Sequence, residues 1–134
     1  MYRFIGFFAR PVIDRPATLP SGVVWREITA PFTGVGVRSP GLANHEPGPD
    51  EARQLLAEVG LGRAADWLFI KYVTWAGRIE SVYGLGSSGN RAFGPGGSDD
   101  DTSQPTYLEL MGAFGVSEAD ALNFPPFVRR FWGE

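Results

Sequence analysis

Apolar and polar positions alternate along the first third of the chain, a pattern typical of β-strands. Segments 2–8 and 23–29 are rich in aromatic and β-branched residues and are bounded by proline and glycine. Segment 33–38 alternates two valines with small residues, and its glycines weaken the strand pattern. We therefore expect two strands and a third, weaker one, followed by an irregular loop over residues 39–49.

Residues 67–85 carry the clearest pattern, that of an aromatic β-hairpin. The sequence Trp-Ala-Gly at 75–77 fits a three-residue turn with its glycine in the left-handed conformation. This turn places Phe69 opposite Tyr83. Both faces of the hairpin are apolar near its open end, and polar residues gather near the turn. We therefore expect two interior strands, with Trp75 projecting from the end of the hairpin.

Helical spacing of apolar residues appears in two regions. Residues 50–59 form the first, with Asp50 as the N-terminal cap and Gly60 as the stop signal. The second region, residues 106–132, holds a capping-box pattern at Thr106 and a second helix start at Ser117. It ends in an aromatic stripe, which we expect to pack on the protein's own core.

The order of these elements predicts the fold class. Strands, a helix, a hairpin and further helices without a βαβ repeat indicate an α+β fold with a mainly antiparallel sheet. The hairpin at about 67–85 lies at its centre, packed by the helix at about 50–59 and by C-terminal helices at about 106–132. A length of 134 residues suits a single globular domain over 1–134.

Composition narrows the classes of function. The chain has no cysteine, which excludes disulfides, a thiol nucleophile and a zinc–thiolate site, and a reducing cytoplasm is the simpler location. Its net charge is −3 and its basic residues are scattered, so we expect no nucleic-acid partner. The apolar run at residues 4–9 is too short for a secretory signal, and no run reaches the roughly 18 residues of a membrane span.

Residues 86–104 form a long glycine-rich, acidic loop that we expect to lack secondary structure. The glycines at 84–89 match the spacing G-x-G-x-x-G, but the residues that follow cannot form the helix that receives a phosphate, so no cofactor is expected. The loop ends in Asp99, Asp100 and Asp101. Adjacent carboxylates do not easily face one cation, so we expect contact with a basic partner or with solvent, and no metal.

His45 is the only histidine, and Glu46 follows it in a predicted loop. Any histidine-based proton transfer has to pass through His45. These two residues are the catalytic candidates if the protein is an enzyme, with the glycine-rich loop as a lid.

The leading hypothesis is a small soluble protein-binding domain. Its expected contact residues are Asp99, Asp100 and Asp101 in the loop and Trp75 and Arg78 at the hairpin end, because aromatic and arginine side chains dominate protein interfaces. An immunity or inhibitor protein that captures a basic partner is an example of this class. The alternatives are the small α+β enzyme and a structural subunit of an assembly, and the sequence leaves the oligomeric state open.

Overall fold

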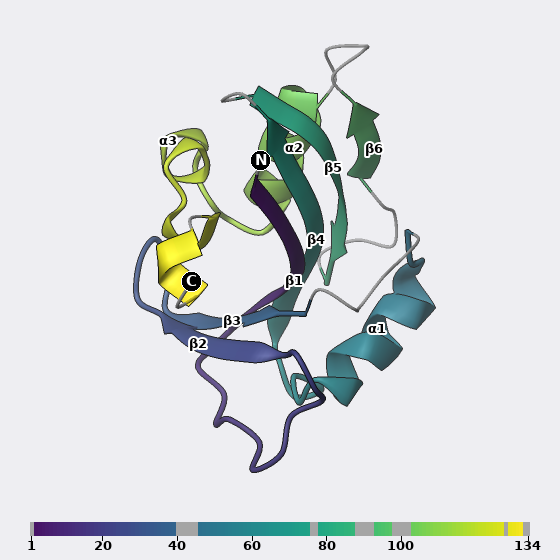
Figure 1. Cartoon of the computed structure of the whole chain (residues 1–134), viewed down its shortest axis with the longest axis vertical. Helices are drawn as coiled ribbons and strands as arrows, with labels where there is room; N and C mark the ends of the chain where they lie inside the picture. Colours follow the sequence, from purple (N-terminus) through teal and green to yellow (C-terminus); the bar gives the residue numbers. More distant parts are fainter. Residues whose placement is uncertain are drawn as a thin grey trace.

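The computed structural model describes residues 2–39, 46–75, 78–87, 93–97, 103–127 and 129–132. The described elements are, in chain order, β1 (Tyr2–Arg10), β2 (Val24–Ile28), β3 (Gly34–Arg38), α1 (Pro49–Glu58), β4 (Asp66–Trp75), β5 (Arg78–Gly86), β6 (Phe93–Gly97), α2 (Ser103–Ala113), α3 (Glu118–Leu122) and the 3₁₀ helices η2 (Pro125–Phe127) and η3 (Arg129–Trp132). Figure 1 shows these elements arranged around one sheet. The α+β fold class is confirmed.

The sheet has six strands in the order β2-β3-β1-β4-β5-β6, and every described pairing is antiparallel. β1 and β4 form its centre and pair along their whole length, from Tyr2 opposite Thr74 to Arg10 opposite Asp66. Their sequences are apolar on both faces, as expected of strands that are covered on both sides.

Alternate side chains of the central strands enter two separate cores. On one face they pack with α2 and the C-terminal segment, through the buried residues Phe4, Phe8, Leu68, Ile70, Val82, Tyr107, Leu110, Met111, Phe114, Phe124 and Trp132. On the other face they pack with α1, through Ile5, Phe7, Phe69, Tyr83, Leu85, Ala52, Leu56 and Val59. In Figure 1, α1 and α3 lie on opposite sides of the sheet. The fold therefore has three layers, with the sheet in the middle.

Arg10, at the end of β1, joins the sheet to the end of α2. Its Nη2 lies 2.6 Å from Oδ2 of Asp66, and the same group donates to the carbonyl oxygen of Phe114. The guanidinium carbon also lies 4.3 Å from the centroid of the Phe114 ring. Such a fork of hydrogen bonds combined with ring stacking is characteristic of arginine.

The expected hairpin is present, but the expected register is wrong. Phe69 lies opposite Leu85, and Tyr83 lies opposite Lys71. Two differences produce this shift. Trp75 itself pairs with Arg78, and the register then slips by one residue at Glu80 of β5, which has no partner between the Thr74 and Val73 pairs.

The segment 86–104 contains a strand, where a span without secondary structure was expected. β6 pairs with β5 through contacts such as Gly84 with Phe93 and Ser81 with Gly97. Four of the five residues in its sequence, Phe-Gly-Pro-Gly-Gly, are glycine or proline, which are depleted in strands. Pairing with β5 satisfies backbone groups that would otherwise be left at the sheet edge, and this tertiary effect overrides the local preference.

Three helix boundaries differ from expectation. The N-terminal cap of α1 is Gly48, and Asp50 lies inside the first turn, where a negative charge is favourable. α2 begins at Ser103, ahead of Thr106. Pro105 does not prevent this earlier start, because it lies in the first helical turn, where proline is tolerated. The aromatic stripe forms η2 and η3 in place of one helix. The stripe packs on the protein's own core, as expected: the ring centroids of Trp132 and Phe4 lie 5.4 Å apart.

Candidate functional site

The end of the β4–β5 hairpin presents an aromatic side chain to solvent. Trp75 is the last residue of β4, and 57% of its surface is exposed. Among the described residues the other large hydrophobic side chains with comparable exposure are Val12 and Leu122, neither of which is aromatic. Trp75 therefore projects from the hairpin end as the sequence pattern predicts. Arg78 pairs with it through the backbone, and its side chain lies outside what the structure describes.

His45, Asp99, Asp100 and Asp101 lie outside the described residues. Their roles in proton transfer or partner binding stay predictions.

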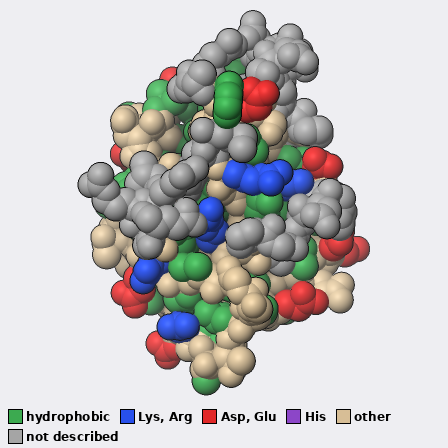
Figure 2. Space-filling view, viewed as in Figure 1, with side chains coloured by type: hydrophobic (Ala, Val, Ile, Leu, Met, Phe, Trp, Pro, Cys, Tyr) green, Lys and Arg blue, Asp and Glu red, His purple; other side chains and the backbone are tan. Residues whose placement is uncertain are grey.

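Glu46 faces a small cavity on the α1 side of the sheet. The cavity has a volume of about 130 Å³ and is lined by Arg3, Ile5, Glu46, Lys71, Val73, Ser81 and Tyr83. The Nζ of Lys71 lies 3.9 Å from Oε1 of Glu46. Figure 2 shows Lys and Arg side chains in the middle of the face that it displays, and others at its lower left beside Asp and Glu side chains.

Tyr83 fixes the segment before α1 to this part of the sheet. Its hydroxyl group donates a hydrogen bond of 2.5 Å to the carbonyl oxygen of Pro47. Burial raises the pKa of Tyr83, and the carboxylates of Glu46 and Glu51 raise it further. The tyrosine hydroxyl thus ties Pro47 to β5, and the sequence pattern had suggested neither this hydrogen bond nor the ion pair.

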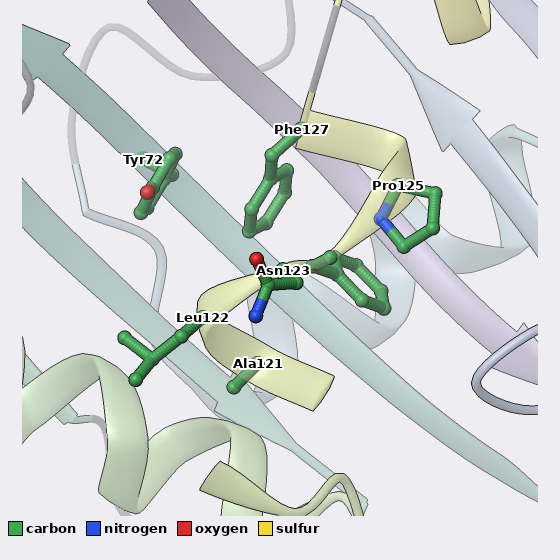
Figure 3. Close-up of a pocket in the computed structure, with 7 residues that line it drawn as sticks. Tyr72, Ala121, Leu122, Asn123, Pro125 and Phe127 are labelled. Atoms are coloured by element: carbon green, nitrogen blue, oxygen red, sulfur yellow. The ribbon is translucent and has the colours of Figure 1, made fainter. Parts of the chain in front are cut away.

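A larger cavity opens on the opposite side of the sheet (Figure 3). Its volume is about 340 Å³, and it is lined by Tyr72, Ala121, Leu122, Asn123, Phe124, Pro125 and Phe127. The ring of Tyr72 stacks on that of Phe127, with centroids 4.3 Å apart and planes inclined by 13°. One strand residue and one continuous C-terminal segment therefore form the cavity.

Three hydrogen bonds hold the C-terminal wall of this cavity in place. The Oγ of Ser117 caps α3 by accepting from the backbone amide of Asp120 at 3.2 Å. The hydroxyl of Tyr107 donates to the carbonyl oxygen of Ala121 at 2.5 Å. The Nε1 of Trp132 donates to the carbonyl oxygen of Pro126 at 2.7 Å. The wall is tied to α2 and to η3, and is a fixed part of the fold.

Burial also affects the two tyrosines beside the cavity. It raises the pKa of Tyr72, and it raises the pKa of Tyr107 far above its ordinary value, with a smaller contribution from Tyr72. Both hydroxyl groups are therefore protonated at neutral pH, and that of Tyr107 donates its hydrogen bond to Ala121.

The sequence pattern contained no sign of the larger cavity. Tyr72 reads as an ordinary strand residue, and Asn123 lies between two helical patterns. The cavity exists because the chain returns to the hairpin about fifty residues later, which local spacing does not encode.

The described part of the chain has no group of three or more His, Asp or Glu side chains arranged to hold a metal ion. Within the same residues, no helix combines the length and the apolar character needed to cross a bilayer. Comparison with protein-family models, curated proteins and solved structures finds no match to this chain.

Proposed function

We propose that this chain is a protein-binding domain whose contact surface is centred on the end of the β4–β5 hairpin. The observation that carries the proposal is the 57% exposure of Trp75 on a strand whose other aromatic residues are buried or partly buried. Leaving an indole ring in water forgoes the burial that stabilises a core, and tryptophan is among the residues most enriched at binding hot spots.

The residues around Trp75 extend this surface along the sheet. Side chains alternate along a strand, so Lys71 and Val73 share a face with Trp75. Arg3 of β1 lies opposite Val73 and is exposed. An exposed tryptophan together with an exposed arginine is a combination that is enriched in protein interfaces.

We further propose that Asp99, Asp100 and Asp101 contribute to binding of the partner. These three carboxylates follow β6, which pairs with the same hairpin. Three adjacent negative charges complement a basic partner, as in an inhibitor or immunity protein that covers a basic active site.

Quantitative affinity capture tests the role of Trp75. The baits are the wild-type protein, Trp75→Ala and Val12→Ala, a matched control because Val12 is also apolar and 42% exposed. A partner of the proposed surface is retained by the wild type and by Val12→Ala and is lost with Trp75→Ala. Calorimetry with the purified partner should then show at least a roughly thirtyfold loss of affinity for Trp75→Ala. Equal retention by all three baits contradicts the proposal.

The acidic residues are tested separately with the same purified partner. Replacing Asp99, Asp100 and Asp101 by Asn should weaken binding and reduce its dependence on salt. An unchanged affinity and an unchanged salt dependence would show that the partner is recognised without these carboxylates.

Glu46 is the one catalytic candidate of the enzyme alternative whose contacts the structure describes. Glu46 is engaged by Lys71, and the nearby hydroxyl of Tyr83 donates to a backbone carbonyl. Both groups therefore fasten the chain, whereas a general acid or base needs to reach a substrate proton.

A further inference from the structure

The cavity beside Tyr72 has the size and walls of a small-molecule site. Its volume of about 340 Å³ falls at the lower end of the range of ligand pockets, roughly 300–1,000 Å³. Tyr72 and Phe127 present stacked rings along one side. Because these two rings stack on each other, a planar ligand ring meets their edges, and such edge-to-face contact adds to the burial of apolar surface.

Two of the described lining residues, Tyr72 and Asn123, carry polar side-chain groups, one a donor and one an acceptor. The Nδ2 of Asn123 donates to the carbonyl oxygen of Ala119 at 3.3 Å, which leaves Oδ1 as the acceptor. In Figure 3 this oxygen points toward Phe127 and the nitrogen points away. Tyr72 lines the cavity and supplies the donor, since a phenol hydroxyl is protonated at neutral pH.

Among the lining residues that the structure describes, none carries a carboxylate, amine, imidazole or guanidinium group. A charged ligand would therefore lose hydration without gaining an ion pair, which is costly. The cavity thus selects against ionised molecules and suits a neutral one.

The cavity is accessible and its shape is already formed. Leu122 lies on its rim with half of its surface exposed, so the cavity opens to solvent beside an apolar group. The wall is fixed next to Leu122 by the bond from Tyr107 to Ala121, and at its other end by the bond from Trp132 to Pro126. A ligand does not have to order this segment, so little binding energy is lost.

From these features we infer that the cavity is a binding site for a small neutral molecule that carries a planar ring and an amide-like group. The ring lies against Tyr72 and Phe127. The amide N–H donates to Oδ1 of Asn123, and the amide oxygen accepts from the hydroxyl of Tyr72. This site is independent of the hairpin end, because Trp75 does not line it.

A matched set of probes tests the ligand class. Benzamide, benzoate and toluene have the same ring but differ in charge and hydrogen bonding, and each is titrated into the ¹⁵N-labelled full chain and followed by NMR. Benzamide should bind with a dissociation constant on the order of millimolar and shift the amide signals of residues 121–127. Benzoate and toluene should bind at least about threefold more weakly. Failure of benzamide to bind, or equal binding of all three probes, overturns the inference.

Variants then test the two polar groups. Tyr72→Phe and Asn123→Ala should each weaken benzamide binding by about three- to tenfold, the effect of one lost hydrogen bond. Glu109→Gln, an exposed change on α2 outside the lining, and Trp75→Ala should leave it unchanged. Unchanged affinity in Tyr72→Phe and Asn123→Ala overturns the inference.

A charge added at the rim gives a test that does not depend on removing a contact. Leu122 is half exposed, so Leu122→Lys should fold normally, with a circular dichroism spectrum like that of the wild type. The new ammonium group should reverse the preference, so that benzoate binds more tightly than benzamide. An unaltered order of affinities would show that the probes bind elsewhere and would overturn the inference.

Discussion

Gly84 allows α2 to lie close against β5. A Cβ at this position would lie 2.4 Å from the carbonyl oxygen of Phe69 and 2.5 Å from Cδ2 of Leu110. The first of these atoms belongs to the neighbouring strand and cannot move without disturbing the sheet. We therefore expect Gly84→Ala to lower the free energy of unfolding by about 3 kcal/mol, as overpacking of a core does, measured by guanidinium unfolding.

Gly112 provides the matched control for this prediction. It lies on α2, and among the described residues an added Cβ would meet no atom within 4 Å beyond its chain neighbours and the backbone of its own helix. Gly112→Ala should therefore raise the free energy of unfolding by about 0.5–1 kcal/mol, because alanine favours helix more than glycine does. Equal stability of Gly84→Ala and the wild type would contradict the close approach. The first glycine of the G-x-G-x-x-G pattern thus has a packing role that needs no nucleotide.

At the scale of elements, α3 depends on its cap. The helix has five residues, too few to form without tertiary contacts and capping. Ser117 Oγ accepts from the amide of Asp120, so Ser117→Ala should lower the free energy of unfolding by about 1 kcal/mol. Urea unfolding measures the loss. Ser117→Asp keeps an acceptor at the same place and should retain most of the stability, and a loss equal to that of Ser117→Ala would contradict the role of the cap.

The elements that were predicted well are those whose signals are local. Ser117 begins a helix as its spacing with Asp120 predicts, and Gly60 follows α1 with a φ of 88°, the left-handed conformation that only glycine adopts readily. The aromatic residues were sufficient to predict the hairpin. Its register was predicted wrongly, because the one-residue slip at Glu80 depends on pairing along the whole strand.

The elements that were missed depend on contacts between distant segments. β6 is a strand only because β5 offers it a partner, and its glycines and proline signal a loop. The larger cavity was missed for the same reason, since Tyr72 and Asn123 acquire a common role only after folding. Exposure of Trp75 was predictable because the end of a hairpin has few neighbours to cover a side chain.

At the scale of the whole molecule, three tyrosines link stability to alkaline pH. Burial raises the pKa of Tyr72, Tyr83 and Tyr107 above the value of about 10 that the unfolded chain has. Above pH 10 the unfolded state therefore loses protons that the folded state keeps, and the free energy of unfolding falls as the pH rises. Below pH 10 both states hold these protons, and the contribution is fully present.

We expect the stability to fall steeply between pH 10 and pH 11.5, by up to about 1.4 kcal/mol per pH unit from Tyr107 alone. Urea unfolding at pH 8, 10, 11 and 11.5 measures the slope. Tyr107→Phe should be less stable than the wild type at pH 8, because the hydrogen bond to Ala121 is lost, yet it should lose less stability on going to pH 11.5. Equal pH slopes for the two proteins would show that Tyr107 ionises in the folded state as it does in the unfolded chain, and that the wall of the larger cavity does not hold its hydroxyl away from water.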